Sequence, residues 1–413
     1  MKAEPENEVK NGECAAPITG DVIGDTAYSE RFVLKILLKL ANRDTLKEEI
    51  KKPTFEDELC TLWDMTAERD VVLYLQKHDT LNLFYFALPV IESSRVIEVI
   101  VGTIANMCCH KEAVGSLLGN KDLLLLLLDF LKSDDSLILN QLLRLINSCL
   151  YVADQHDICT WMDIFETVEY PQSIYFILTN STNKDLLMTA LENLNTICTN
   201  CKIDESQKFT SLFETQDALA AVHTAHKEYS GQSSSEEKLE RLHLITLQMI
   251  LHLYKTENSE PPSLEDSMNA LNLLRDILIS YESRINEYYK IDEDFLDVLE
   301  ATTVFIQYIE ASQTCSPDKY FNPSYNMWKI LAPHRKQKKS ERIQFMDDIK
   351  DALALIMCVY MSKCGDVHLL KVLDDIGDDY GCIVSQISNA ELQAKIANRA
   401  LNYRNRLNKN IDS

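Results

Sequence analysis

Glycine and proline are scarce in this chain of 413 residues, which contains only 10 of each. Average usage is about 7% glycine and 5% proline, so the supply of turn-forming residues is small. Turn-dense all-β folds and glycine-rich cofactor loops are hard to build from that supply. The phosphate-binding motifs G-x-x-x-x-G-K-[ST] and G-x-G-x-x-G are absent, as are H-E-x-x-H and G-x-S-x-G. The sequence therefore predicts no cofactor.

Basic residues are also in deficit, since 41 Lys and Arg oppose 64 Asp and Glu and leave a formal charge of −23. A surface that binds duplex nucleic acid needs a basic face to neutralise phosphates, and this charge would repel a polyanion. We therefore expect no general nucleic-acid binding. The acidic body instead predicts a protein partner with a basic or extended segment, whose association slows at high salt.

Long hydrophobic runs are missing as well. The longest leucine run, Leu123 to Leu128, is far shorter than the roughly 20 apolar residues that span a bilayer. The N-terminal sequence MKAEPENEVKNGEC has no apolar segment of the kind found in secretory signals. We expect no membrane association and an intracellular location, where most of the 12 cysteines are reduced.

Apolar residues at three- and four-residue spacing recur from about Tyr28 almost to the C-terminus, and long alternating runs are absent. This periodicity predicts an all-α fold, with Ser29 and Thr54 as caps of two early helices. Residues 1–25 are polar and lack the periodicity, so they are expected to form a disordered acidic tail. Residues 26–413 are expected to form a single helical array, with a soft boundary near 229–237.

Internal similarity predicts how these helices are arranged. The segments VGTIANMCC, LLRLINSCL and ALENLNTIC each carry an asparagine followed within three residues by a cysteine. The asparagines Asn106, Asn147 and Asn195 recur at intervals close to the 40 to 47 residues of HEAT and armadillo repeats. The pattern predicts a right-handed α-solenoid of armadillo/HEAT type, clearest over 92–200. The three asparagines are then candidates for a groove that binds an extended peptide; the alternative is an exposed helix flank.

One weak metal motif combines Cys198 and Cys201 with His223 and His226. A Cys₂His₂ zinc site normally has about 12 residues between its two pairs, and this spacing is much longer. Cys198 also falls on an apolar stripe, where a free cysteine is commonly part of the core. The sequence therefore predicts no metal site.

A basic run at 334–342 opposes the acidic character of the chain. It predicts a nuclear localisation segment exposed to an importin. The alternative is a solvated loop that pairs with the acidic body. Its basic residues are Arg335, Lys336, Lys338, Lys339 and Arg342.

Three N-terminal segments resemble signature blocks of the serum amyloid A-like family: GDVIGDTAYSERFVLKILLKL at 20–40, EDELCTLWDMTAERDVVLYLQKHD at 56–79, and VGTIANMCC at 101–109. The resemblance covers roughly residues 20–155. It implies an armadillo-type helical fold, no enzymatic activity, and a nuclear or nucleocytoplasmic role linked to cell proliferation. The residues that match the blocks are Gly20, Asp21, Ile23, Gly24, Thr26, Tyr28, Ser29, Trp63, Asp64, Met65, Asn106 and Met107.

From the residues alone, the first of these blocks is expected to cap the terminal repeat rather than to dock a partner, and Trp63 is expected to anchor helix packing. The sequence as a whole predicts a protein-interaction scaffold in the nucleus, with some presence in the cytoplasm. The alternatives are an adaptor that contacts nucleic acid through the basic loop 334–342, and a transport-type solenoid that binds cargo.

Overall fold

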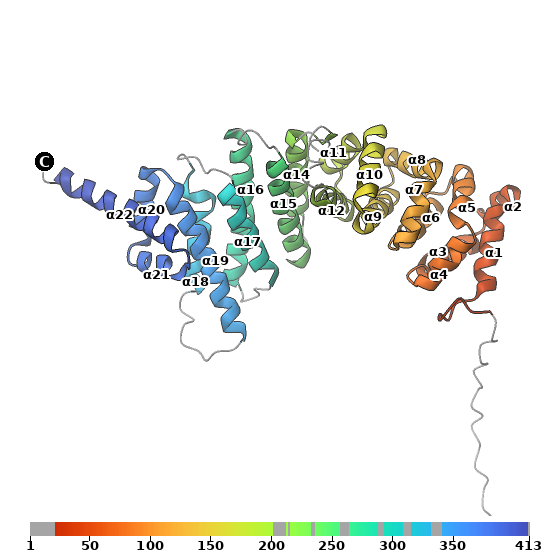
Figure 1. The fold of residues 1–413 in the computed structure, drawn as a ribbon, viewed down its shortest axis with the longest axis horizontal. Helices are drawn as coiled ribbons and strands as arrows, with labels where there is room; N and C mark the ends of the chain where they lie inside the picture. The colour runs from red at the N-terminus through yellow and green to blue at the C-terminus, as the bar shows by residue number, and fades with distance from the viewer. Residues whose placement is uncertain are drawn as a thin grey trace, which may run out of the picture. The chain divides into compact units, whose positions relative to one another are not determined.

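The computed structural model describes residues 21–200, 212–213, 215–232, 236–256, 264–287, 293–308, 315–331 and 341–411. Throughout these ranges the regular structure is helical and no strand occurs (Figure 1). The predicted all-α class is confirmed. Within the same ranges, no helix is both long and apolar enough to cross a membrane.

The chain divides into two compact units, Met1–Asp157 and Ile158–Ser413. This boundary differs from the soft point predicted near 229–237, where Tyr229 is buried in a helix and residues 233–235 lie outside the described residues. The soft boundary near 229–237 stays a prediction. That residues 26–413 form a single array stays a prediction.

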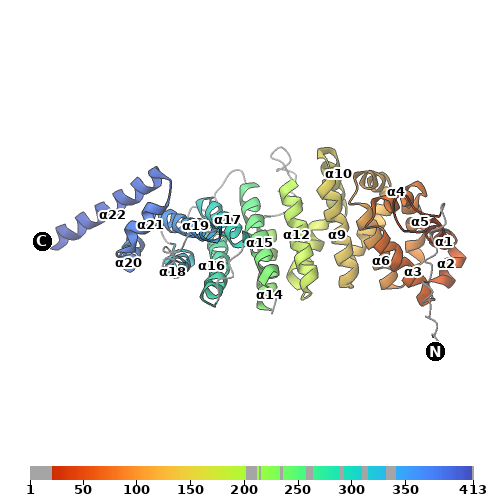
Figure 2. The same ribbon diagram turned by 90° about the horizontal axis from the view of Figure 1, so that it is seen from below.

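The first unit has two layers of helices. Helix α6 packs between α3 and α9 in one layer (Figure 2), and α5 packs between α1 and α8 in the other. Side chains of α6 such as Ile100, Val101 and Ile104 are fully buried. The helices are α1 Glu30–Ala41, α2 Arg43–Glu49, α3 Pro53–Met65, α4 Arg69–Lys77, α5 Thr80–Ala87, α6 Ser94–Met107, α7 Lys111–Gly119, α8 Lys121–Asp129 and α9 Ser136–Val152.

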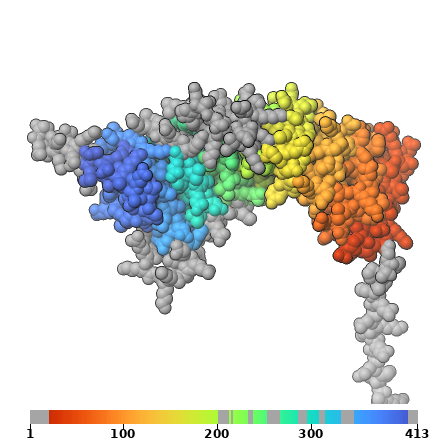
Figure 3. All heavy atoms as spheres, viewed as in Figure 1, coloured from red at the N-terminus to blue at the C-terminus, as the bar shows by residue number. Residues whose placement is uncertain are grey.

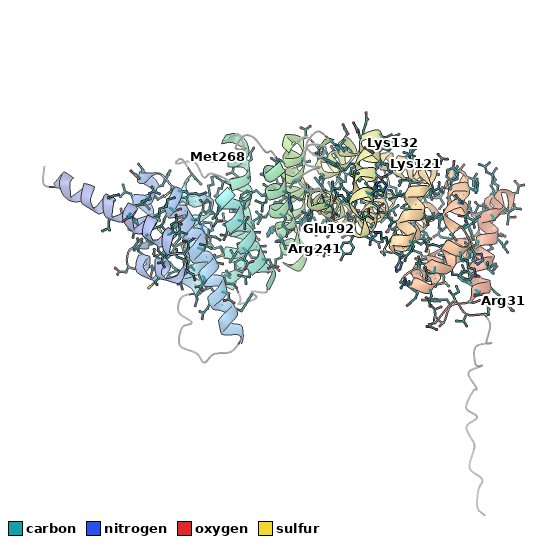
Figure 4. The ribbon with its side chains drawn as sticks, viewed as in Figure 1. Arg31, Lys121, Lys132, Glu192, Arg241 and Met268 are labelled. Carbon is teal, nitrogen blue, oxygen red and sulfur yellow. The ribbon has the colours of Figure 1, made fainter. Side chains whose placement is uncertain are left out.

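The second unit stacks its helices in chain order. Successive contacts join α12 to α15, α15 to α17, and α17 to α19, while α14 packs on α11 and α18 on α16. Glu192 of α12 and Arg241 of α15 point toward one another, with 2.7 Å between Oε1 and Nη2 (Figure 4). The helices are α10 Gln155–Thr167, which begins in the first unit, α11 Tyr170–Asn180, α12 Lys184–Asn200, α14 Thr215–Gly231, α15 Glu236–Thr256, α16 Leu264–Glu287, α17 Glu293–Tyr308, α18 Phe321–Leu331, α19 Glu341–Lys363, α20 Asp366–Ile376, α21 Asp379–Gln386 and α22 Ala390–Ile411.

Stacking in chain order within each unit agrees with an all-α solenoid, because each helix packs on a helix a few positions earlier in the chain. On the face drawn in Figure 3, the described atoms of neighbouring helices within each unit lie in contact. The armadillo/HEAT repeat type and its right-handed sense stay predictions.

Candidate interaction surface on the first unit

The start of helix α1 is closed by the residues of the first signature block. The Asp21 carboxylate accepts hydrogen bonds from the Ser29 hydroxyl and from the Arg31 backbone N–H, both at 2.9 Å. The backbone hydrogen bond from Arg31 is the largest cause of the lowered pKa of Asp21. Ser29 in turn accepts from the Phe32 N–H at 3.2 Å, which confirms it as the N-cap. Residues 21–25, assigned from sequence to the disordered tail, are therefore part of the helix cap.

Gly24 fixes how this cap lies on helix α4. Its φ of +52° is in the left-handed region, and a Cβ there would collide with the Asp70 carboxylate. The same carboxylate accepts from the Asp25 N–H at 2.9 Å. The Thr26 hydroxyl donates to the Ile23 carbonyl at 2.7 Å, and Ile23 is buried. The block thus packs onto its own unit, which supports the capping interpretation over docking of a partner.

The second and third signature blocks meet between helices α3 and α6. The indole of Trp63 lies directly over Gly102, where a Cβ would come within 2.5 Å of the ring. Asn106 then reaches across and donates to the Trp63 carbonyl at 3.3 Å and to the Thr66 hydroxyl at 3.1 Å. The Trp63 carbonyl, in the last turn of α3, also accepts from the N–H and the hydroxyl of Thr66, so Asn106 adds a third donor to that helix end. Met65 is buried beside it.

A third helix joins this contact through Arg144 of α9. Its Nη2 donates to the Asn106 Oδ1 at 3.4 Å and its Nη1 to the Gln141 Oε1 at 2.5 Å. Trp63 and Asn106 are half-buried and Arg144 is exposed, so all three reach the surface. We call this set, Trp63, Asn106 and Arg144, the ladder surface. Hydrogen bonds hold its polar members in place before any partner binds.

Arg95 extends the ladder surface at its edge. The guanidinium lies over the Trp63 ring, 5.9 Å from its centroid, and forms a 2.7 Å ion pair with the nearly buried carboxylate of Glu98. The hydrogen bond to Glu98 raises the pKa of Arg95, so the guanidinium stays protonated. Arg95 therefore contributes a partly exposed cation beside an aromatic ring.

The comparisons with known proteins point to one set of relatives. The chain is 32% identical over 183 residues to the Homo sapiens protein SAAL1, 27% over 284 residues to saal1 of Danio rerio, and 29% over 267 residues to saal1 of Xenopus tropicalis. These relatives are vertebrate SAAL1 proteins, and the chain is similar to them over part of their length. The resemblance to the serum amyloid A-like family is confirmed.

The matched regions cover 38%, 56% and 54% of these three SAAL1 relatives, and 41%, 66% and 62% of this chain. The chain thus matches less than two thirds of the length of each of these relatives. No model of a known family matches the chain. Among solved structures, an engineered protein aligns over 90% of the chain at 13% identity, with a TM-score of 0.35.

The sequence predicts a peptide-binding groove at Asn106, Asn147 and Asn195, and only Asn106 of these lies in a signature block. Asn147 is half-buried on α9. Asn195 lies on α12 in the second unit, where its Nδ2 donates to the Gln248 Oε1 at 3.5 Å while its Oδ1 is buried without a hydrogen-bond partner. Only Asn106 is placed with other signature residues. A shared peptide groove stays a prediction.

The basic run lies mostly outside the described residues. This applies to Arg335, Lys336, Lys338 and Lys339, and to Gly20 of the first signature block. Arg342 falls in helix α19, but its side chain is outside the described part. The nuclear localisation segment therefore stays a prediction.

The zinc motif is only partly described. Cys198 is buried on α12 and His226 on α14, whereas Cys201 lies outside the described residues. In the part of the chain that the structure describes, no group of three or more His, Cys, Asp or Glu side chains is arranged to hold a metal ion. The ring of His226 instead lies 5.4 Å from that of His243 on α15.

Sequence reasoning missed a buried titratable cluster in the second unit. It consists of His226, His243, Glu240 and Arg284, and Glu240 and Arg284 form a buried ion pair. Burial lowers the pKa of His226 to about 4, helped by the charge of His223, and holds that of His243 well below its usual value. The available signal was the spacing of Glu240 and His243, which places both on one helix face. That spacing alone does not say whether the face is buried.

Proposed function

We propose that this chain is a non-enzymatic protein-interaction scaffold of the armadillo type, which binds partners through the ladder surface of its first unit. The SAAL1 resemblance and the all-helical fold are compatible with such a scaffold. By the same resemblance we propose a nuclear role linked to cell proliferation.

The observation that carries the proposal is the chain of hydrogen bonds from Trp63 through Asn106 to Arg144. These contacts cross three helices and bring together residues about forty positions apart. Side chains that are already fixed lose little conformational entropy when a partner binds. An aromatic ring and an arginine are also the residue types that contribute most to protein interfaces.

The proposed partner presents an extended segment. The charge of −23 acts over long distances and favours the encounter with a segment that is basic overall, so association should slow as salt is added. Contacts at the ladder surface then select among the segments that arrive.

The test is quantitative proximity labelling in cells, followed by binding measurements with the purified partners. The test variant combines Leu137→Ala, Arg144→Ala and Tyr151→Ala, because Leu137 and Tyr151 are 52% and 87% exposed on α9. The control is Phe86→Ala, since Phe86 is 65% exposed on α5, in the other layer.

We expect a subset of partners that is lost with the α9 variant and retained with Phe86→Ala, while both variants unfold at the wild-type temperature. Identical partner sets for all three proteins would contradict the proposal.

The nuclear role has a separate test. A fluorescent fusion in which Arg335, Lys336, Lys338, Lys339 and Arg342 are replaced by glutamine should move toward the cytoplasm. An unchanged distribution would remove the importin from the proposed partners.

A further inference from the structure

We infer that Arg144 is a docking point for a carboxylate, which a partner segment presents between two apolar side chains that contact Leu137 and Tyr151. This inference rests on the proposed function, because it names the chemistry of the segment that the ladder surface accepts.

Arg144 has neutral side chains as its hydrogen-bond partners. Among the described residues its hydrogen bonds go to the neutral amides of Gln141 and Asn106, and it forms no ion pair. Most other arginines of the described part have a carboxylate within reach, although the chain has 64 acidic residues to distribute. The paired arginines are Arg31, Arg69, Arg95, Arg241, Arg284 and Arg399.

The guanidinium of Arg144 has more N–H donors than the two amides accept. A guanidinium has five N–H donors in a rigid plane, and two amide acceptors engage one donor on each Nη of Arg144. The remaining donors belong to an exposed side chain whose orientation is fixed from both sides. A carboxylate matches this planar fork better than any other group in proteins, because its two oxygens accept in parallel.

Arg144 lies on α9 between two exposed side chains, Leu137 and Tyr151. Leu137 and Tyr151 lie seven residues before and after it, so the three side chains share one helix face at intervals of about 10.5 Å. Both flanking side chains are largely exposed, at 52% and 87%. An apolar, a cationic and an aromatic contact thus follow one another along a single helix.

The charge of the Arg144 guanidinium is opposite in sign to the net charge of the chain, and the two act at different distances. The net charge governs the encounter beyond about 8 to 10 Å, whereas a guanidinium and a carboxylate interact in direct contact. A segment that is basic overall and carries one carboxylate satisfies both conditions. The carboxylate then sets the register of the segment along α9.

The experiment uses a random peptide library displayed on phage and selected against the full chain. Selected peptides are then synthesised and their Kd measured for the wild type, Arg144→Gln, Leu137→Ala with Tyr151→Ala, and the control Arg69→Gln. Arg69 is a matched control because it is also exposed on the first unit, with its Nη2 3.9 Å from the carboxylate of Glu112.

We expect the selected peptides to share an Asp or Glu flanked by apolar residues. Arg144→Gln should raise their Kd at least tenfold, and replacing the shared acid by its amide should do the same, because either change removes a charge-assisted hydrogen bond. The amide peptide should bind the wild type and Arg144→Gln almost equally. Arg69→Gln should leave every Kd unchanged.

Two other outcomes overturn the inference in distinguishable ways. Peptides that need Leu137 and Tyr151 but have no shared acid, or that bind Arg144→Gln as tightly as the wild type, would refute the carboxylate and leave the scaffold function intact. Failure to select any peptide that depends on Leu137, Arg144 or Tyr151 would refute both.

Discussion

The two units of the chain differ in how deeply their charged pairs lie. In the first unit, Asn106 and Arg144 bridge helices at the surface, and the buried carboxylate of Glu98 pairs with an arginine, Arg95, whose side chain is 44% exposed. In the second unit, two histidines and a Glu–Arg ion pair are enclosed between helices α14, α15 and α16. An amide at the surface is exposed to water at little free-energy cost, whereas a buried charge is stable only when a partner of opposite charge lies beside it. The second unit is therefore more sensitive than the first to the loss of one charge.

The largest effect is expected from breaking the buried ion pair of the second unit. Glu240→Ala should destabilise that unit by about 3 to 5 kcal/mol, because the charge of Arg284 is left enclosed without its partner. Unit-resolved hydrogen exchange measures the loss and its location. The matched control is Glu192→Ala, which breaks the more exposed pair with Arg241 and should cost about 1 kcal/mol or less. Equal losses would show that burial does not distinguish the two pairs.

Acidification should weaken the second unit more than the first. His226 has a pKa of about 4 in the folded chain and near 6.5 when unfolded, so below pH 6.5 the unfolded state binds a proton that the folded state does not. Stability is therefore complete near pH 7 and falls by about 3 kcal/mol as the pH approaches 4. His243, whose pKa is lowered in the same direction by burial and by the charges of His226 and Arg284, adds to the loss.

Denaturant unfolding of the full chain at pH 7 and at pH 4.5 measures this effect, with hydrogen exchange to assign it. The variant His226→Leu should lose much of the pH dependence between these values. An unchanged pH dependence would show that His226 is not responsible.

A smaller effect is expected where α3 approaches α6 in the first unit. Gly102→Ala should cost about 1 to 3 kcal/mol, because the new methyl group overlaps the Trp63 ring. Gly115→Ala in α7 is the control, since no atom lies within 4 Å of the added Cβ and alanine favours a helix by up to about 1 kcal/mol. Thermal unfolding of the two variants should shift in opposite directions; a shared direction would contradict the close packing of Trp63.

The smallest expected effect is the difference in stability between the variants Asn106→Ala and Asn195→Ala. Asn106→Ala should lower stability by about 1 kcal/mol, because the Thr66 hydroxyl and the Trp63 carbonyl each lose one hydrogen bond, although the carbonyl keeps those from the Thr66 N–H and hydroxyl. Asn195→Ala should cost less, since its hydrogen bond is long and its Oδ1 is already without a partner. Chemical denaturation of each single variant tests this order, and the reverse order would show that the second unit depends more on its asparagine.

Much of the fold follows from local sequence. The apolar stripe of α1 and its Ser29 cap are where they were predicted, because helical spacing and an N-cap are properties of a few consecutive residues. Thr54 was a wrong prediction. Helix α3 begins at Pro53, with Lys52 at the cap and no side-chain hydrogen bond there. Proline fixes the φ that the first helical position requires, so the cap lies two residues earlier than predicted.

The candidate site was only partly predictable. Trp63 and Asn106 were singled out, but their contact depends on Gly102, which lets α3 and α6 approach closely. Arg144 was not singled out at all, because nothing in its neighbourhood along the chain indicates that an amide of another helix accepts its hydrogen bond.

The sequence by itself determined the helical class, the acidic charge and the resemblance of the N-terminal third to a known family, because these depend on composition and short-range spacing. Only the tertiary structure decided which polar side chains are enclosed and which are held at the surface. Spacing assigns a residue to a helix face, but burial depends on which other helix covers that face, and that helix comes from a distant part of the chain.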